Sequence, residues 1–131
     1  MIERTLILLK PDAVQRGIVG EVLTRFERAG LKVVGMKMLS PTKEHFEEHY
    51  EGISKLISRW GQEIFDITLS AMTEAPVIAI ALEGVEAVTH VRKMVGTTDP
   101  KDSAPGTIRG DYTHVTRSYT NSRGGTLPNI I

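Results

Sequence analysis

The sequence predicts an α/β chain of the α+β type: a ferredoxin-like, split βαβ sandwich on an antiparallel four-stranded sheet. Three apolar runs bounded by turn residues predict strands at 5–9, 32–39 and 77–82. Helical spacing of apolar residues between and after them gives the order β-α-β-α-α-β-α, which fits this fold class with one strand still to follow. The 131 residues, 40% of them hydrophobic, are expected to form a single domain over 1–131.

The first half of the chain is divided by clear turn and helix-end signals. Lys10-Pro11-Asp12, after the first run, is interpreted as a turn. Apolar residues with helical spacing follow over 17–29, and Gly30 stops this helix. After the second run, Ser40-Pro41-Thr42 predicts a turn and then a helix that begins with Thr42 and His45 as a weak N-cap.

The second half is expected to be mostly helical on either side of the third strand. Residues 43–74 have a helical pattern with a break at Gly61, and 85–95 form a further helix with an apolar side. A fourth strand should follow, and Asn129-Ile130-Ile131 is interpreted as its beginning. The polar stretch 112–128 between them is interpreted as a surface loop.

Composition excludes several functional classes. Lysine plus arginine equals aspartate plus glutamate, 16 of each, whereas proteins that bind nucleic acid through its phosphates usually have a basic excess. The absence of cysteine excludes disulfides and cysteine-based metal or redox chemistry. No apolar run is long enough to span a bilayer, and the N-terminus lacks the layout of a secretory signal. We therefore expect a cytoplasmic protein with neither nucleic acid nor membrane as its partner.

The segment 96–111 carries the strongest signal of a binding site. Its prolines and glycines predict a shaped loop with neither helix nor strand. Long loops of this kind are usually functional or disordered. Arg92 precedes the loop, and Thr98 and Arg109 lie within it, so two guanidiniums and a hydroxyl are available to phosphate oxygens. The alternative is a helix-end charge for Arg92 and a loop salt bridge for Arg109.

Other candidates remain open on residue type alone. Lys10 follows the first strand, where it could neutralise phosphate or simply be solvated. Tyr50 and Phe65 could belong to the core, and Phe65 could instead stack on a planar ligand. His45 and His49 have the i, i+4 spacing of metal ligands but no recognisable third ligand, so no metal site is predicted. The common Gly-rich nucleotide fingerprints do not occur.

Several segments together resemble the nucleoside diphosphate kinase family. These are Glu3-Arg4-Thr5-Leu6, 10–17 (KPDAVQRG), 25–32 (RFERAGLK), Glu48-His49-Tyr50, Leu82-Glu83-Gly84 and 104–111 (APGTIRGD). They cover most of the chain, and the last of them is highly specific. The stretch 112–128 is longer than in common family members and resembles some archaeal and bacterial forms.

The resemblance implies a ferredoxin-like enzyme that moves the γ-phosphate of a nucleoside triphosphate such as ATP to a nucleoside diphosphate. The route is ping-pong, through a phosphohistidine, with Mg²⁺ carried on the nucleotide phosphates. Family members form homo-oligomers, either hexamers or tetramers built from dimers. By motif, the site residues are Lys10 at the sugar and the transferred phosphate, Tyr50 supporting it, Phe65 stacking on the base, Arg92, Thr98 and Arg109 binding phosphate, and Asn129 contacting the sugar.

The chain departs from the family at its C-terminal end. The family motif runs from an asparagine through two apolar residues to the nucleophilic histidine, which is therefore expected immediately after Ile131. None of His45, His49, His90 and His114 occupies that position. We expect the 131 residues to lack the remainder of the last strand and the C-terminal helix, and to transfer no phosphate by themselves.

Two other functions remain as alternatives at this point. The first is a non-catalytic module of the same fold that binds nucleotide or mediates oligomeric interactions. The second is an RNA-binding ferredoxin-like domain, which would need aromatic residues on its central strands for base stacking. The three predicted strands contain none, so the sequence disfavours RNA binding.

Overall fold

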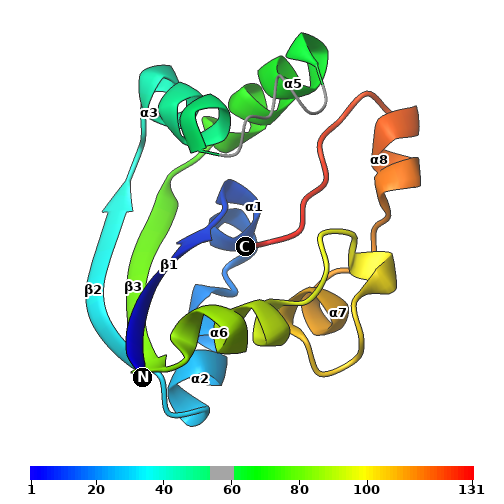
Figure 1. Cartoon of the computed structure of the whole chain (residues 1–131). Coiled ribbons are helices and arrows are strands. Elements are labelled where there is room, and N and C mark those ends of the chain that lie inside the picture. Colours follow the sequence, from blue (N-terminus) through cyan, green and yellow to red (C-terminus); the bar gives the residue numbers. More distant parts are fainter. Residues whose placement is uncertain (54–60) are drawn as a thin grey trace.

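The computed structural model describes residues 1–53 and 61–131, with an antiparallel sheet at its centre. The strands are β1 (Ile2–Leu9), β2 (Lys32–Leu39) and β3 (Val77–Val85), in the order β1-β3-β2 (Figure 1). The register places Leu6 opposite Ala81 on one side of β3 and Met36 opposite Ile80 on the other. All three predicted strands are thus confirmed. β1 and β3 bury apolar side chains in the core, whereas those of β2 are partly buried or exposed.

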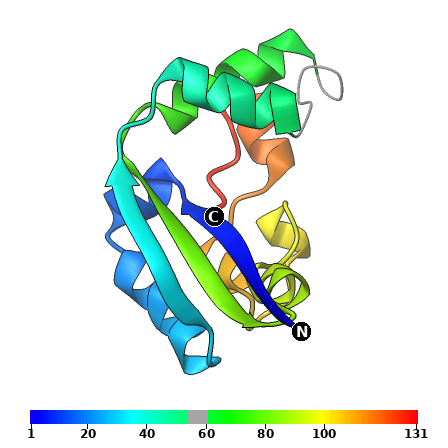
Figure 2. The ribbon, with the colours of Figure 1, turned by 60° about the vertical axis from the view of Figure 1, so that its left-hand side comes forward.

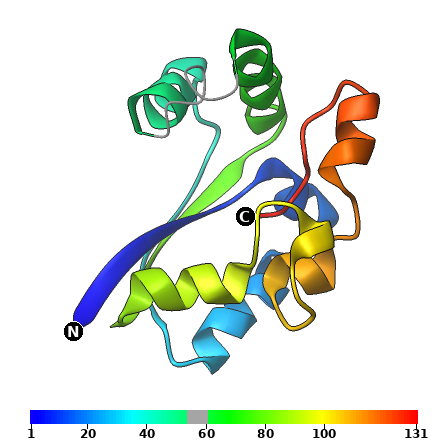
Figure 3. The ribbon, with the colours of Figure 1, turned by 45° about the vertical axis from the view of Figure 1, so that its right-hand side comes forward.

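Helices cover one face of the sheet and extend beyond its end. They are α1 (Pro11–Arg16), α2 (Val19–Arg28), α3 (Lys43–Glu47), the π-helical η1 (Glu48–Ile53), α5 (Gln62–Met72), α6 (Ala87–Val95), the 3-10 turn η2 (Pro100–Asp102), α7 (Ile108–Tyr112) and α8 (Arg117–Ser122). Phe26 of α2 and Val91 of α6 pack with Ile7, Ile80 and Leu82 in the main core. A smaller core lies between α3 and α5, which sit side by side beyond the sheet (Figure 3).

Two expectations about local structure are wrong, because signals for a helix start outweigh turn composition. Lys10-Pro11-Asp12 is not a turn: Pro11 is the first residue of α1, where a missing amide hydrogen costs nothing. The segment 96–111 contains η2 and most of α7, since the side chains of Asp99 and Thr107 accept hydrogen bonds from the amides of Lys101 and Gly110. By contrast, Thr42 and His45 form the expected cap as a full capping box.

The C-terminal residues also differ from expectation. The stretch 112–128 is not wholly loop, because it contains α8, which begins after the N-cap Thr116. Asn129 to Ile131 form no strand, and the sheet of the described residues has three strands. Ile130 has a φ of 76°, in the left-handed region, which interrupts an extended backbone. The segment instead returns to the end of β1, where the Lys10 amide donates to the Ile130 carbonyl at 2.8 Å (Figure 2).

Candidate functional site

A cavity of about 770 Å³ opens between β1, α6 and the C-terminal residues. Six of the seven predicted site residues line it: Lys10, Tyr50, Arg92, Thr98, Arg109 and Asn129. They come from six places in the chain, from the end of β1 to the last turn of α6 and the residues after α8. The fold therefore gathers most of the residues that the sequence singled out.

Lys10 lies at the junction of β1 and α1, with its ammonium group directed inward. Its Nζ donates to Asn129 Oδ1 at 2.6 Å and to the Leu127 carbonyl at 3.5 Å. Burial lowers the Lys10 pKa to about 8; nearby Asp12 opposes this shift and Arg109 adds to it. Lys10 is therefore a fixed, desolvated cation in the wall of the cavity, not a solvated residue at the end of a strand.

Asn129 connects this lysine to the loop that follows α6. Its side chain is 4% exposed, its Oδ1 accepts from Lys10, and its Nδ2 donates to the Thr98 carbonyl at 2.8 Å. The side-chain amide of Asn129 thus joins Lys10 and Thr98, two residues that are far apart in the sequence. The geometry makes Asn129 a spacer that sets the distance between the lysine and the loop.

Replacing Asn129 with alanine should lower the free energy of unfolding by about 1 to 2 kcal/mol, because the Lys10 ammonium would lose its shortest hydrogen bond. Urea unfolding at neutral pH measures the change. Asn121→Ala, on the exposed side of α8, is the matched control and should have little effect. Equal losses in the two variants would contradict the bridging role of Asn129.

Arg109 holds three segments of the cavity wall together. Its guanidinium donates to the carbonyls of Gly96 at 3.4 Å and Asn129 at 3.3 Å, and also to the carbonyl of Ile131. Burial lowers the Arg109 pKa to about 10, and the neighbouring Arg92 adds to this shift. The side chain remains charged at neutral pH. Its positive charge is partly desolvated, and three backbone oxygens accept hydrogen bonds from it.

Arg92 and Thr98 are exposed where the cavity opens to solvent. Arg92 lies in the last turn of α6, close enough to Arg109 for the two positive charges to disfavour each other. An anion placed between two like charges relieves this repulsion, so the pair favours an anionic ligand. Arginine side chains also match the geometry of phosphate oxygens. The arrangement supports the anion site that residues 92–109 predicted from sequence.

Tyr50 and His49 line the same cavity as these cations. The Tyr50 ring lies edge-on to the His49 ring, with 5.0 Å between centroids, and burial raises the Tyr50 pKa to about 12. His49 lines the cavity, although the sequence assigned it no role in the site beyond its place in the Glu48-His49-Tyr50 motif. The sequence signal that could have placed His49 in the site is its position directly before Tyr50. Within residues 1–53 and 61–131, no cluster of three metal-ligating side chains occurs.

Phe65 lies apart from the other predicted residues. It is 4% exposed and packs in the smaller core with Phe46, Leu69, Met72 and Val77. It is not among the residues that line the cavity. The structure therefore places Phe65 in the core position that the sequence also allowed, and it does not bring the ring to the six residues above.

A ferredoxin-like sheet with a lysine and two arginines around one cavity forms a site that can hold an anionic ligand such as phosphate. The family model described as nucleoside diphosphate kinase matches residues 3–122. The chain therefore belongs to the nucleoside diphosphate kinase family, and both the resemblance noted in the sequence and the fold class are confirmed. Across the described part of the chain, the helices are too short or too polar to cross a membrane.

Named relatives and solved structures agree with this assignment. The nucleoside diphosphate kinases of Pyrococcus furiosus and Thermococcus kodakarensis are 52% and 50% identical over 111 residues, which is 85% of this chain but 65% and 60% of theirs. This chain thus spans less than two thirds of the length of those relatives. A transition-state mimic of the Borrelia burgdorferi enzyme, with bound vanadate and ADP, superposes with a TM-score of 0.92 at 37% identity, over 98% of this chain and 76% of that one.

Another solved relative contains a nucleotide. The nucleoside diphosphate kinase of Halobacterium salinarum in complex with CDP has a TM-score of 0.78 at 43% identity. The match covers 87% of this chain and 71% of that chain. Both solved relatives therefore carry the same fold together with a nucleoside diphosphate.

Proposed function

We propose that this chain binds nucleoside di- and triphosphates, with the phosphates held between Arg92, Thr98 and Arg109. The protein would transfer the γ-phosphate of a nucleoside triphosphate such as ATP to a nucleoside diphosphate, by a ping-pong route through a phosphohistidine. The observation that carries the proposal is the convergence of Lys10, Arg92 and Arg109 on one cavity. Relatives with bound ADP and CDP support it.

The geometry suits the needs of phosphoryl transfer, which depends on positioning and charge neutralisation more than on covalent help from the protein. The desolvated ammonium of Lys10 would face the transferred phosphate, supported by Tyr50 across the cavity. Asn129 would contact the sugar through the Oδ1 lone pair that Lys10 leaves available. Phe65 has no part in this function, because its ring is buried in the smaller core.

Magnesium would enter on the nucleotide. Among the described residues that line the cavity there is no aspartate or glutamate, and its three strong cations would repel a bare divalent ion. A magnesium ion already bound by phosphate oxygens does not need protein carboxylates. We also propose a homo-oligomer, hexameric or tetrameric, located in the cytoplasm.

Calorimetric titration tests the binding step. ADP with Mg²⁺ should bind, and Arg92→Gln should weaken ADP roughly 10- to 100-fold, because a charge-assisted hydrogen bond to phosphate is lost. Lys93→Gln is the matched control, since it removes the neighbouring exposed charge on α6. Equal ADP affinities in the two variants would place the phosphates elsewhere.

Transfer is tested separately with ATP labelled in its γ-phosphate. Acid-labile label on histidine that GDP removes would support the phosphohistidine route. The label is sought in the full-length protein, because the 131 residues are expected to lack the nucleophilic histidine. ADP binding without such label in that protein would support the alternative, a non-catalytic nucleotide-binding module of the same fold. Absence of ADP binding would contradict both functions.

A further inference from the structure

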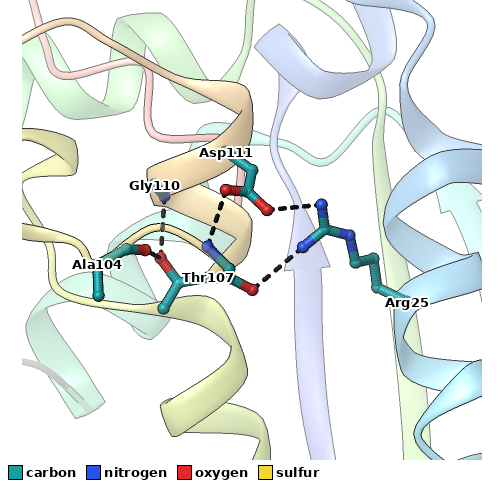
Figure 4. Close-up of polar contacts among 6 residues, drawn as sticks. Arg25, Ala104, Thr107, Gly110 and Asp111 are labelled. Atoms are coloured by element: carbon teal, nitrogen blue, oxygen red, sulfur yellow. Dashed lines mark hydrogen bonds and ion pairs between the residues drawn. The ribbon is translucent and has the colours of Figure 1, made fainter.

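Arg25 lies outside the cavity and contacts the segment 104–111, the turn that contains the start of α7. Figure 4 shows its guanidinium, which extends from α2, facing the segment 104–111. Nη1 donates to the Gly106 carbonyl at 3.1 Å, and Nη2 pairs with Asp111 Oδ2 at 2.6 Å. The same group lies over the Tyr112 ring, 5.0 Å from its centroid. Arg25 thus contacts the residue before the N-cap of α7 and a residue within α7 with a single planar group.

The turn is also closed from within. The Gly106 amide donates to Asp111 Oδ1 at 2.8 Å, so one carboxylate joins this amide to Arg25 (Figure 4). Thr107 Oγ1 donates to the Ala104 carbonyl at 2.6 Å and accepts from the Gly110 amide at 3.0 Å. These hydrogen bonds hold the backbone of residues 104–111 in one conformation. Arg25 ties this conformation to α2 by polar contacts, beside the packing of Ile108 in the main core.

The turn carries a residue of the phosphate site on its other side. Arg109 belongs to α7, between Gly106 and Asp111, and its guanidinium reaches the carbonyls of Gly96 and Asn129 in the cavity wall. Any shift or rotation of α7 therefore moves the Arg109 guanidinium. Arg25 is not among the residues that line the cavity, so it cannot act on a ligand there directly.

We propose that Arg25 is a positioning residue for the phosphate site, fixing the start of α7 and thereby the orientation of Arg109. This inference rests on the proposed function, because it concerns the binding of phosphate by Arg109. The role requires arginine: the planar fork reaches a carbonyl and a carboxylate together, whereas lysine offers one point charge. Asp111 is the charged partner of Arg25 in this contact.

The experiment compares Arg25→Gln and Arg25→Lys with Arg28→Gln, an exposed arginine of the same helix. Calorimetry gives the affinity of each protein for ADP with Mg²⁺ and for adenosine, which has no phosphate. Arg25→Gln should weaken ADP roughly tenfold and leave adenosine unchanged, Arg25→Lys should recover part of the loss, and Arg28→Gln should resemble the wild type. General loss of folding would affect both ligands equally, so the ADP-to-adenosine ratio isolates positioning.

A second route keeps the inference testable if Arg25→Gln folds poorly. Asp111→Asn breaks the same contact from the other side and should give the same selective loss, and the double variant should be no worse than either single one. An unchanged ADP-to-adenosine ratio in both single variants, with ADP still bound by the wild type, would overturn the inference and leave the proposed function standing. A wild type that does not bind ADP would overturn both.

Discussion

Gly110→Ala should lower the free energy of unfolding by about 3 kcal/mol, because there is no space for a methyl group at this position. A Cβ on Gly110 would lie 2.2 Å from the Ala104 carbonyl oxygen and 2.7 Å from Thr107 Oγ1. The oxygen belongs to backbone that the Thr107 hydroxyl already holds, so it cannot move aside cheaply. Urea unfolding followed by circular dichroism measures the loss.

The control for this variant is Gly20→Ala in α2. A Cβ at Gly20 meets no atom within 4 Å, and alanine favours helix over glycine, so this variant should be more stable by up to about 1 kcal/mol. The same Gly→Ala change is thus expected to lower the free energy of unfolding at position 110 and to raise it at position 20. A Gly110→Ala protein as stable as the wild type would show that the turn does not approach Gly110 this closely.

Stability should rise by about 2 kcal/mol between about pH 7.5 and about pH 9.5, and Lys10 should be the cause. Burial lowers the Lys10 pKa from 10.5 to about 8 in the folded chain. Between these two values the unfolded chain binds the proton that the folded chain has released, so raising the pH favours folding. Below about pH 8 the folded chain carries the full cost of a desolvated ammonium group.

Urea unfolding of the wild type and Lys10→Met across this range tests the assignment. The methionine variant should lose most of the pH dependence, whereas Lys37→Met, exposed on β2, should keep it. Arg109, with a pKa of about 10, and Tyr50, with one of about 12, titrate mainly above the chosen window. If the free energy of unfolding of Lys10→Met still rises with pH across this range, another group causes the pH dependence.

The sequence predicted the regular elements well where local signals were strong. The bounds of β2 match the predicted run at 32–39, and the Thr42 cap lies where the helix was expected to begin. These features depend on side-chain alternation and on hydrogen bonds between residues three apart, both of which can be read along the chain. Pro11 and Ile130 were misread, because a cap position and a left-handed backbone depend on neighbours in space.

The sequence by itself determined which residues could bind a phosphorylated ligand: the cations at 10, 92 and 109 and the family to which their motifs belong. Only the tertiary structure decided how they act. Lys10 meets Asn129 across 119 positions of sequence, Arg25 reaches Gly106 across 81, and Phe65 is buried in a core. Such contacts depend on how the whole chain packs, because burial and hydrogen-bond partners come from segments that no local pattern relates.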